Sequence, residues 1–138
     1  MKRRNFVKSG LLGTASTFLV PSLFIRGNND EKVKIAICGL GRYAEQWIAP
    51  AIEESKFAKV TAIITGSENK ISKWQKTYNI KSNNVYNYDN LDSIANNPEI
   101  DCVYICTPTG NHAEYTIRSF QAGKHVICEK PMAPTVED

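Results

Sequence analysis

The chain has 138 residues and a formal charge of +3 at pH 7, and 42% of its residues are hydrophobic. That length suffices for one domain with a core of its own and excludes a multidomain architecture. Residues 1–30 hold five basic side chains and one acidic side chain, a net charge of +4, so residues 31–138 carry −1. A nearly neutral domain offers no basic surface for nucleic acid.

The first thirty residues are expected to be an export signal and linker, with the folded domain in residues 31–138. The run RRNFVK at residues 3–8 precedes an apolar stretch at residues 10–25, which polar residues and Pro21 interrupt. That stretch is too short and too polar to span a bilayer comfortably. An arginine pair followed by Phe and Lys resembles a twin-arginine signal. We therefore expect export to the periplasm, with the signal either removed or retained as a membrane anchor.

Strand and helix signals alternate through the rest of the chain. Short apolar runs predict strands, and apolar residues at helical spacing predict helices. Strands are expected at residues 33–38, 59–64, 84–86, 101–106 and 125–128, and helices at 43–54, 69–78, 91–95 and 111–122. Pro50 is expected to kink the first helix, and Gly123 is expected to end the last one. This alternation is typical of a right-handed, doubly wound α/β fold with a mostly parallel sheet.

The four cysteines lie inside predicted strands rather than in loops, at Cys38, Cys102, Cys106 and Cys128. None of them has CxxC spacing, so we predict no zinc site and no other metal site. Small apolar packing is the expected role. A disulfide framework is not expected in a chain with this much regular structure.

A glycine-rich turn follows the first predicted strand directly. It is Gly39-Leu40-Gly41-Arg42-Tyr43-Ala44, and it leads into the first helix. Gly39 permits a tight turn, Gly41 lets the backbone approach a pyrophosphate, and Ala44 lets helix and strand pack closely. Backbone N–H groups at the helix start then face the phosphates. We therefore predict that the first five residues of this turn bind a dinucleotide; the alternative is an ordinary turn before a helix.

The end of the second predicted strand bears on which dinucleotide is bound. NAD-selective folds place Asp or Glu there to accept hydrogen bonds from the ribose 2′-hydroxyl. This chain has Thr65 at that point, with Lys70 five residues further on. A hydroxyl and an ammonium favour a 2′-phosphate, so NADP is predicted over NAD. Two alternatives stay open, namely Glu68 in the acidic role and Lys70 as a solvated helix lysine.

A polar loop at residues 107–112 follows the fourth predicted strand. Ligands bind at the carboxyl ends of parallel strands, so this loop is expected to face the cofactor. Thr107 and Pro108 are placed to contact the nucleotide, and Asn111 is expected to cap the next helix. His112 lies in the first turn of that helix, near the crevice. We assign all four residues to the cofactor site; a histidine on the helix surface is the alternative for His112.

The tripeptide Glu129-Lys130-Pro131 ends the fifth predicted strand, at the same edge of the sheet. A lysine there can hydrogen-bond or protonate a substrate oxygen while hydride moves at the neighbouring carbon. Lys130 is therefore the predicted catalytic residue and also a cofactor contact. Glu129 is expected to orient Lys130 or to contact the ribose. An exposed loop with a charge pair is the alternative.

Taken in order, these motifs resemble the N-terminal half of the Gfo/Idh/MocA oxidoreductases over about residues 32–138. The segments that carry the resemblance are residues 39–44, 107–112 and 122–131. The exported glucose-fructose oxidoreductase branch is the closest, because it too has a twin-arginine signal and a tightly held NADP. The resemblance implies a Rossmann-type domain that binds NADP or NAD. In that branch Thr65 and Lys70 match the positions that meet the 2′-phosphate, and Lys130 matches the catalytic lysine of the EKP motif.

The family's second, α+β domain is expected to lie beyond residue 138 and to be missing from this chain. It supplies most substrate contacts and a further Asp and His, so the chain alone is not expected to complete the reaction. The resemblance implies a sugar or cyclic polyol as substrate and a homo-oligomer at full length. Two other readings stay open: a non-catalytic nucleotide-binding module, and an NAD-dependent glycosidase of the same family, against which the Glu-Lys-Pro motif counts.

Overall fold

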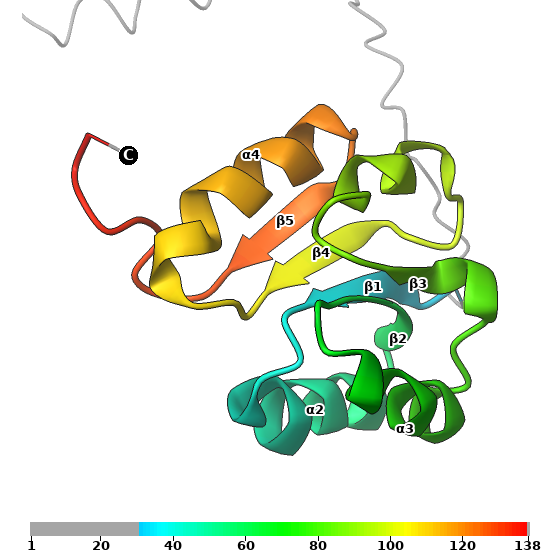
Figure 1. Ribbon diagram of the computed structural model, residues 1–138. Helices are drawn as coiled ribbons and strands as arrows, with labels where there is room; N and C mark the ends of the chain where they lie inside the picture. Colours follow the sequence, from blue (N-terminus) through cyan, green and yellow to red (C-terminus); the bar gives the residue numbers. More distant parts are fainter. Residues whose placement is uncertain (1–30, 138) are drawn as a thin grey trace, which may run out of the picture.

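The computed structural model describes residues 31–137, which fold around a five-stranded parallel sheet with the order β3-β2-β1-β4-β5 (Figure 1). The strands are β1 (Val33–Cys38), β2 (Ala58–Ile64), β3 (Val85–Tyr86), β4 (Cys102–Ile105) and β5 (His125–Cys128). The helical elements are the π-helix η1 (Ala44–Ile48), α2 (Ala49–Glu54), α3 (Glu68–Tyr78), α4 (His112–Gln121) and the 3-10 helices η2 (Ser82–Asn84), η3 (Leu91–Asn96) and η4 (Thr109–Asn111). The doubly wound α/β fold expected from the sequence is confirmed, and all four strand pairs are parallel.

The predicted export signal at residues 1–30 lies outside the described residues, so export stays a prediction. Replacing Arg3 and Arg4 by lysine is expected to keep the protein in the cytoplasm, which cell fractionation measures. Unchanged export of that variant would contradict the twin-arginine assignment.

Within residues 31–137, none of the helices combines the length and the apolar character that a membrane crossing requires.

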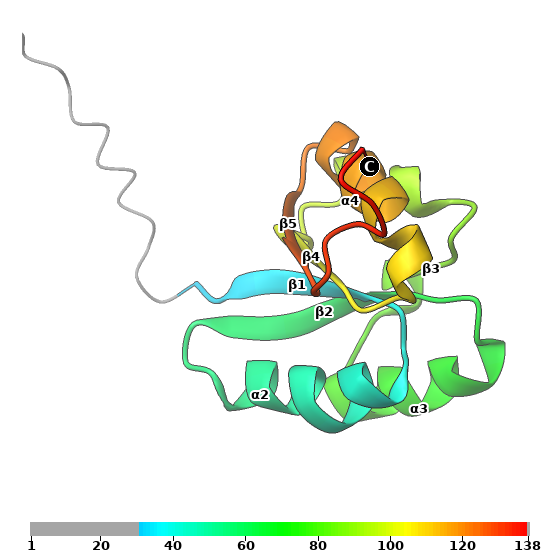
Figure 2. The same cartoon turned by 90° about the vertical axis from the view of Figure 1, so that its left-hand side faces the viewer.

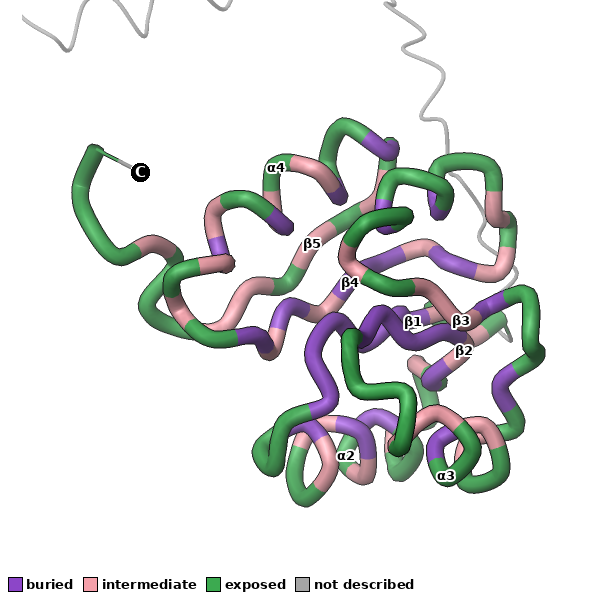
Figure 3. The backbone as a smooth tube through the Cα atoms, in the orientation of Figure 1, coloured by how far each residue is buried: buried purple, intermediate pink, exposed green. Residues whose placement is uncertain are grey.

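Helices cover both faces of the sheet (Figure 2). On one face α2 and α3 contribute Ile52 and Trp74 to a buried apolar cluster. On the other face η3 and α4 contribute Leu91 and Tyr115 to a second cluster. The central strand β1 therefore has no face left to solvent, and residues 35–38 are all buried (Figure 3). A nearly continuous apolar run is what a strand covered on both faces requires.

The edge strand β5 departs from that pattern. Its side chains alternate, with His125 and Ile127 exposed and Val126 and Cys128 half-buried (Figure 3). The half-buried side chains pack into the cluster beneath α4. Ile127 keeps 46% of its surface exposed, so the described residues leave the opposite face of β5 uncovered.

The first predicted helix is divided in front of Pro50. This proline has no N–H to donate to the carbonyl four residues earlier, so a regular α-helix cannot continue through it. The preceding turn is π-helical, with the Ala49 N–H bonded to the Ala44 carbonyl five residues back, and α2 follows from Ala49. A widened helical turn thus lies directly before Pro50, where the kink is expected.

Asn111 does not cap α4, contrary to the sequence-based expectation. Its side chain makes no capping hydrogen bond, and its backbone dihedrals (φ −107°, ψ −2°) are already helical. The 3-10 turn η4 precedes α4 and is closed by a 2.9 Å bond from the Asn111 N–H to the Pro108 carbonyl. That turn continues the helix backwards, so Asn111 lacks the extended backbone of a capping residue. The other end is as predicted, since Gly123 follows α4 with φ of +73°.

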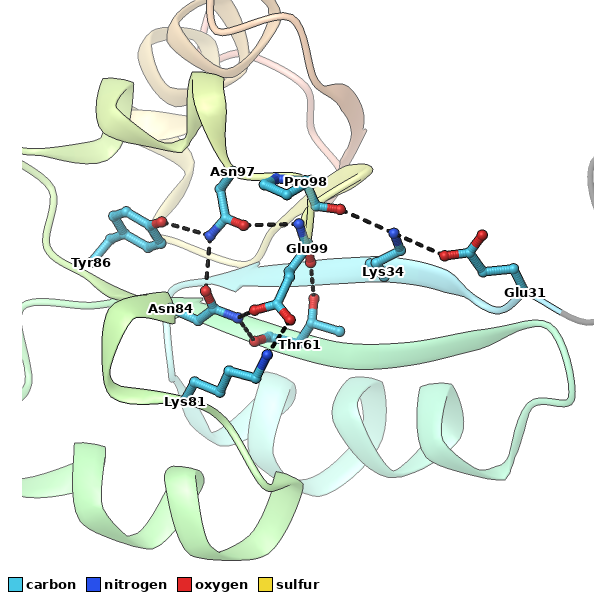
Figure 4. A network of polar contacts seen from close by, with 9 residues as sticks. All are labelled: Glu31, Lys34, Thr61, Lys81, Asn84, Tyr86, Asn97, Pro98 and Glu99. Atoms are coloured by element: carbon cyan, nitrogen blue, oxygen red, sulfur yellow. Dashed lines mark hydrogen bonds and ion pairs between the residues drawn. The ribbon is translucent and has the colours of Figure 1, made fainter.

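A network of polar side chains joins the segments that lead into β3 and β4 (Figure 4). Its centre is Asn84, which is 2% exposed and donates to the Thr61 carbonyl (3.0 Å) and the Glu99 carboxylate (2.9 Å). Asn97 donates to Asn84 Oδ1 (2.8 Å), and Lys81 pairs with Glu99. The hydrogen bonds from Lys81 and Asn84 lower the pKa of Glu99. Both ends of the Asn84 amide are therefore satisfied, as burial requires.

Replacing Asn84 by alanine is expected to reduce the free energy of unfolding by about 2 kcal/mol. The reason is that the partly buried groups bonded to the Asn84 amide lose their hydrogen-bond partner. Urea unfolding measures this change. Asn83→Ala removes an exposed side chain from the same 3-10 helix, and should change the free energy of unfolding by less than about 0.5 kcal/mol. Equal losses for the two variants would contradict the role given to the network.

Candidate functional site

The loops predicted to bind a ligand follow β1, β2, β4 and β5, at the carboxyl edge of the sheet. The chain leaves β1 toward α2 on one face and leaves β4 toward α4 on the other (Figure 2). The winding therefore reverses between these two neighbouring strands, and such a switch point opens a crevice in which ligands bind. Sheet bonding continues up to the loops: the Gly39 N–H bonds to the Ile64 carbonyl (2.9 Å) and the Cys106 N–H to the Cys38 carbonyl (2.8 Å).

The two glycines of the turn after β1 have opposite surroundings. Gly39 has φ of +93°, and a Cβ on it would lie 2.9 Å from the carbonyl carbon of Cys106 and from both N and Cγ2 of Thr107. Backbone atoms cannot move aside for it, so only glycine fits. A Cβ on Gly41 would meet no described atom within 4 Å. Gly41 thus leaves open the approach to its backbone that a dinucleotide would need.

A cavity of about 430 Å³ adjoins this turn at the switch point. The residues that line it are Tyr43, Cys106, Thr107, Pro108, Thr109, His112, Glu129 and Lys130. Six of these eight were predicted from the sequence, while Cys106 and Thr109 were missed although they flank predicted residues. The predicted residues outside the lining are Gly39, Leu40, Gly41, Arg42, Thr65, Lys70 and Asn111. The cavity thus brings together the loops after three strands that are separate in sequence.

Thr107 offers a polar group that the described residues do not use. It is 7% exposed, and its hydroxyl is buried without a hydrogen-bond partner among residues 31–137. A buried hydroxyl usually has a partner, and one that lines a cavity can bind a polar ligand. The open backbone of Gly41 and this hydroxyl both fit the predicted nucleotide.

His112 is buried beneath the cavity, with 2% of its surface exposed, so the alternative of a surface histidine is wrong. Its Nε2 lies 2.7 Å from the Thr107 carbonyl oxygen, and its Nδ1 lies 2.7 Å from the Pro131 carbonyl oxygen. Both ring nitrogens therefore already have protein partners. The sequence predicted a role for His112 at this site but carried no signal of these two contacts, because both are made to backbone carbonyl groups.

Glu129 and Lys130 differ in their surroundings. Lys130 is exposed at the cavity, whereas Glu129 is half-buried and accepts a hydrogen bond from the Tyr104 hydroxyl (2.8 Å). Burial, together with the bond to Glu129, raises the pKa of Tyr104. The sequence analysis missed Tyr104, but the register carried a signal for it. Tyr104 pairs with Ile127, so Glu129, two residues further along, lies diagonally opposite on the same face.

The Cys106 thiol lines the cavity but is not a nucleophile at neutral pH. Burial raises its pKa to about 12, and the negative charge of Glu129 acts in the same direction. A thiol with that pKa is protonated at pH 7, and the thiolate is the reactive form. The cysteine therefore contributes packing, as the sequence analysis expected.

Lys70 reaches the glycine-rich turn from the start of α3. Its Nζ donates to the Leu40 carbonyl (2.5 Å) and lies 4.0 Å from the Glu45 carboxylate. Glu45 is bonded more closely by Lys73, and that hydrogen bond lowers the pKa of Glu45. The alternative of a fully solvated Lys70 is therefore wrong, since its side chain is only 33% exposed. Glu45 and Lys73 were missed because they come from different helices.

Thr65 directly follows β2, five residues before Lys70. It is 4% exposed, and its hydroxyl accepts a 3.0 Å hydrogen bond from the Ser67 N–H. The Thr65 N–H in turn bonds to the Tyr86 carbonyl (2.9 Å). Thr65 therefore fixes the shape of the loop between β2 and α3, from which Lys70 extends.

Residues 33–138 match the model of an oxidoreductase family, Gfo/Idh/MocA, that is described by its NAD-binding Rossmann fold. The chain belongs to the Gfo/Idh/MocA family. The family resemblance seen in the sequence is thereby confirmed, and residues 33–138 are its NAD(P)-binding domain. The parallel sheet, the switch point and the glycine turn described above are the parts of this Gfo/Idh/MocA domain that the chain supplies.

Three relatives illustrate the Gfo/Idh/MocA membership. The aldose-aldose oxidoreductase of Caulobacter crescentus, solved with glycerol, is 40% identical with a TM-score of 0.75 over 78% of this chain and 32% of its own. The scyllo-inositol dehydrogenase of Lactobacillus casei, solved with NAD(H) and scyllo-inositol, is 29% identical with a TM-score of 0.67 over 78% and 30%. The NADP⁺-dependent scyllo-inositol 2-dehydrogenase IolW of Bacillus subtilis is 30% identical over 78% and 28%.

The chain spans less than a third of the length of the curated Gfo/Idh/MocA relatives that it matches. The matched part is the nucleotide-binding part of the family, which is also where the cavity and the glycine turn lie.

The two turn glycines are expected to respond differently to substitution by alanine. Gly39→Ala places a methyl group 2.9 Å from fixed backbone atoms at φ of +93°, so it should destabilise the domain by about 2 kcal/mol or more. Gly41→Ala should leave the free energy of unfolding within about 0.5 kcal/mol and weaken dinucleotide binding instead. Thermal unfolding and fluorescence titration with NADPH separate the two effects; an equally unstable Gly41→Ala variant would contradict this assignment.

Proposed function

We propose that this chain is the cofactor half of an NADP-dependent oxidoreductase that moves hydride to or from a sugar or a cyclic polyol. The observation that carries the proposal is the cavity that Lys130 and Thr107 both line and that Tyr43 of the glycine-rich turn adjoins. Relatives with matching domains are named for reactions on aldoses and inositols, which supports a polyhydroxylated substrate. The aldose-aldose oxidoreductase supports a placement near the exported glucose-fructose oxidoreductase branch.

In this mechanism the nicotinamide of the bound cofactor gives or takes the hydride. Gly41 admits the pyrophosphate to the backbone, and the buried Thr107 hydroxyl donates to or accepts from the nucleotide. Lys130, whose exposed side chain lines the cavity, would give a proton to the substrate oxygen from its ammonium form in reduction and take one on its neutral amine form in oxidation. Glu129, held by Tyr104, lines the same cavity.

The preference for NADP rests on Lys70. Its ammonium is already at the glycine turn, it has three donors, and the Leu40 carbonyl uses one of them. Glu45 is bonded chiefly to Lys73, so it leaves Lys70 available to a 2′-phosphate. Relatives are named with either NAD(H) or NADP, so the choice follows from residues of this chain.

Lys70→Ala is expected to weaken NADPH binding about tenfold or more and to leave NADH binding within about twofold, since a charge-assisted hydrogen bond to phosphate is lost. Titration of cofactor fluorescence measures both affinities. Lys76→Ala is the matched control, because Lys76 is an exposed lysine in the last turn of the same helix. Tighter binding of NADH than of NADPH by the unaltered chain would rule out the preference.

Lys130→Met in the complete protein should lower the hydride-transfer rate by roughly a hundredfold or more while cofactor binding persists, because the proton donor is lost. Nicotinamide absorbance at saturating sugar or inositol measures the rate. Lys56→Met, at an exposed lysine between α2 and β2, should leave the rate unchanged. Cofactor binding without any hydride transfer in the unaltered protein would instead favour a non-catalytic nucleotide-binding module. Size-exclusion chromatography of the same sample tests the expected homo-oligomer.

A further inference from the structure

We propose that His112 is a positioning residue for Lys130, and that it acts by holding the backbone carbonyl groups of Thr107 and Pro131, one at each ring nitrogen. The inference deepens the proposed function, on which its catalytic meaning rests. The sequence analysis placed His112 in contact with the cofactor. The two bonds to carbonyl oxygens give it another task, since they occupy both of its polar atoms.

The two carbonyl groups that His112 contacts lie in different loops. Thr107 belongs to the loop after β4, and Pro131 directly follows Lys130 in the loop after β5. These strands are neighbours in the sheet, and the bond from the Glu129 N–H to the Ile105 carbonyl (3.1 Å) continues their pairing to the end of β5. Beyond that point His112 joins the two loops through its side chain.

The ring makes both contacts away from solvent. Each ring nitrogen lies 2.7 Å from a carbonyl oxygen, which is within hydrogen-bond distance. The side chain is 2% exposed, so water does not compete for either contact. Both polar atoms of His112 are therefore engaged with the protein backbone, and neither is left for a ligand.

The contact with Pro131 bears on the lysine. Pro131 directly follows Lys130, so holding the Pro131 carbonyl restrains the loop that carries the lysine. Thr107 at the other end packs against the backbone of Gly39, with no room for a Cβ between them. One buried ring therefore connects the lysine loop to the loop that contacts the glycine turn. Lys130 is oriented by a residue that does not touch its ammonium in any contact that the described residues show.

Backbone relaxation of His112→Ala tests positioning as distinct from general stability. The order parameters of residues 129–132 are expected to fall from about 0.85 to below about 0.6, while those of β1 and β2 stay unchanged. A uniform loss across the domain, or no change in residues 129–132, would overturn the proposal. His112→Gln keeps amide donors and should show a smaller local loss, so it replaces the alanine variant if that one does not fold. His125→Gln is the control.

NADPH titration of the same samples keeps this inference separate from the proposed function. His112→Ala is expected to bind NADPH about tenfold more weakly than the unaltered chain, because two walls of the cavity lose their link. If the unaltered chain binds no NADPH, the proposed function fails. The order of residues 129–132 in the His112→Ala variant then still decides whether His112 holds the two loops.

Discussion

The close approach of Gly39 to the backbone of Cys106 and Thr107 is the constraint on which the rest of the site depends. With no side chain between them, the loop after β1 and the loop after β4 meet at the point where the sheet reverses its winding. The cavity exists because these two loops separate again immediately beyond this contact. One continues toward α2 on one face of the sheet, and the other continues toward α4 on the opposite face (Figure 2). The side chain of His112 then links the loop after β4 to the loop after β5.

The two ends of the sheet differ in how completely their polar groups are hydrogen-bonded. Buried amide and carboxylate groups around Asn84 join the segments that enter the strands, where no ligand site was predicted (Figure 4). The opposite end is built from glycine, an unused hydroxyl and an exposed lysine, which contribute little packing of their own. Groups left without partners cost stability, so a site of this kind needs a rigid base elsewhere in the domain.

The sequence predicted the fold and much of the site because those features are local. Apolar runs located all five strands, and the residues that follow β1, β4 and β5 had to meet at one edge of a parallel sheet. The errors and omissions arose from contacts across the fold. The cap expected at Asn111 gave way to a 3-10 turn. Tyr104 was missed because its bond to Glu129 depends on the register between two strands.

The hydrogen bond from Lys70 to the Leu40 carbonyl links the preference for one cofactor to the flexibility of the glycine-rich turn. The same ammonium orders the glycine-rich turn and is available to a phosphate. Thermodynamic linkage makes such effects reciprocal. If phosphate binding favours the ordered turn by a given free energy, then ordering the turn by other means strengthens phosphate binding by the same free energy. Discrimination between the two dinucleotides would then be carried partly by the conformational entropy of residues 39–43, without any change in the atoms that touch the ligand.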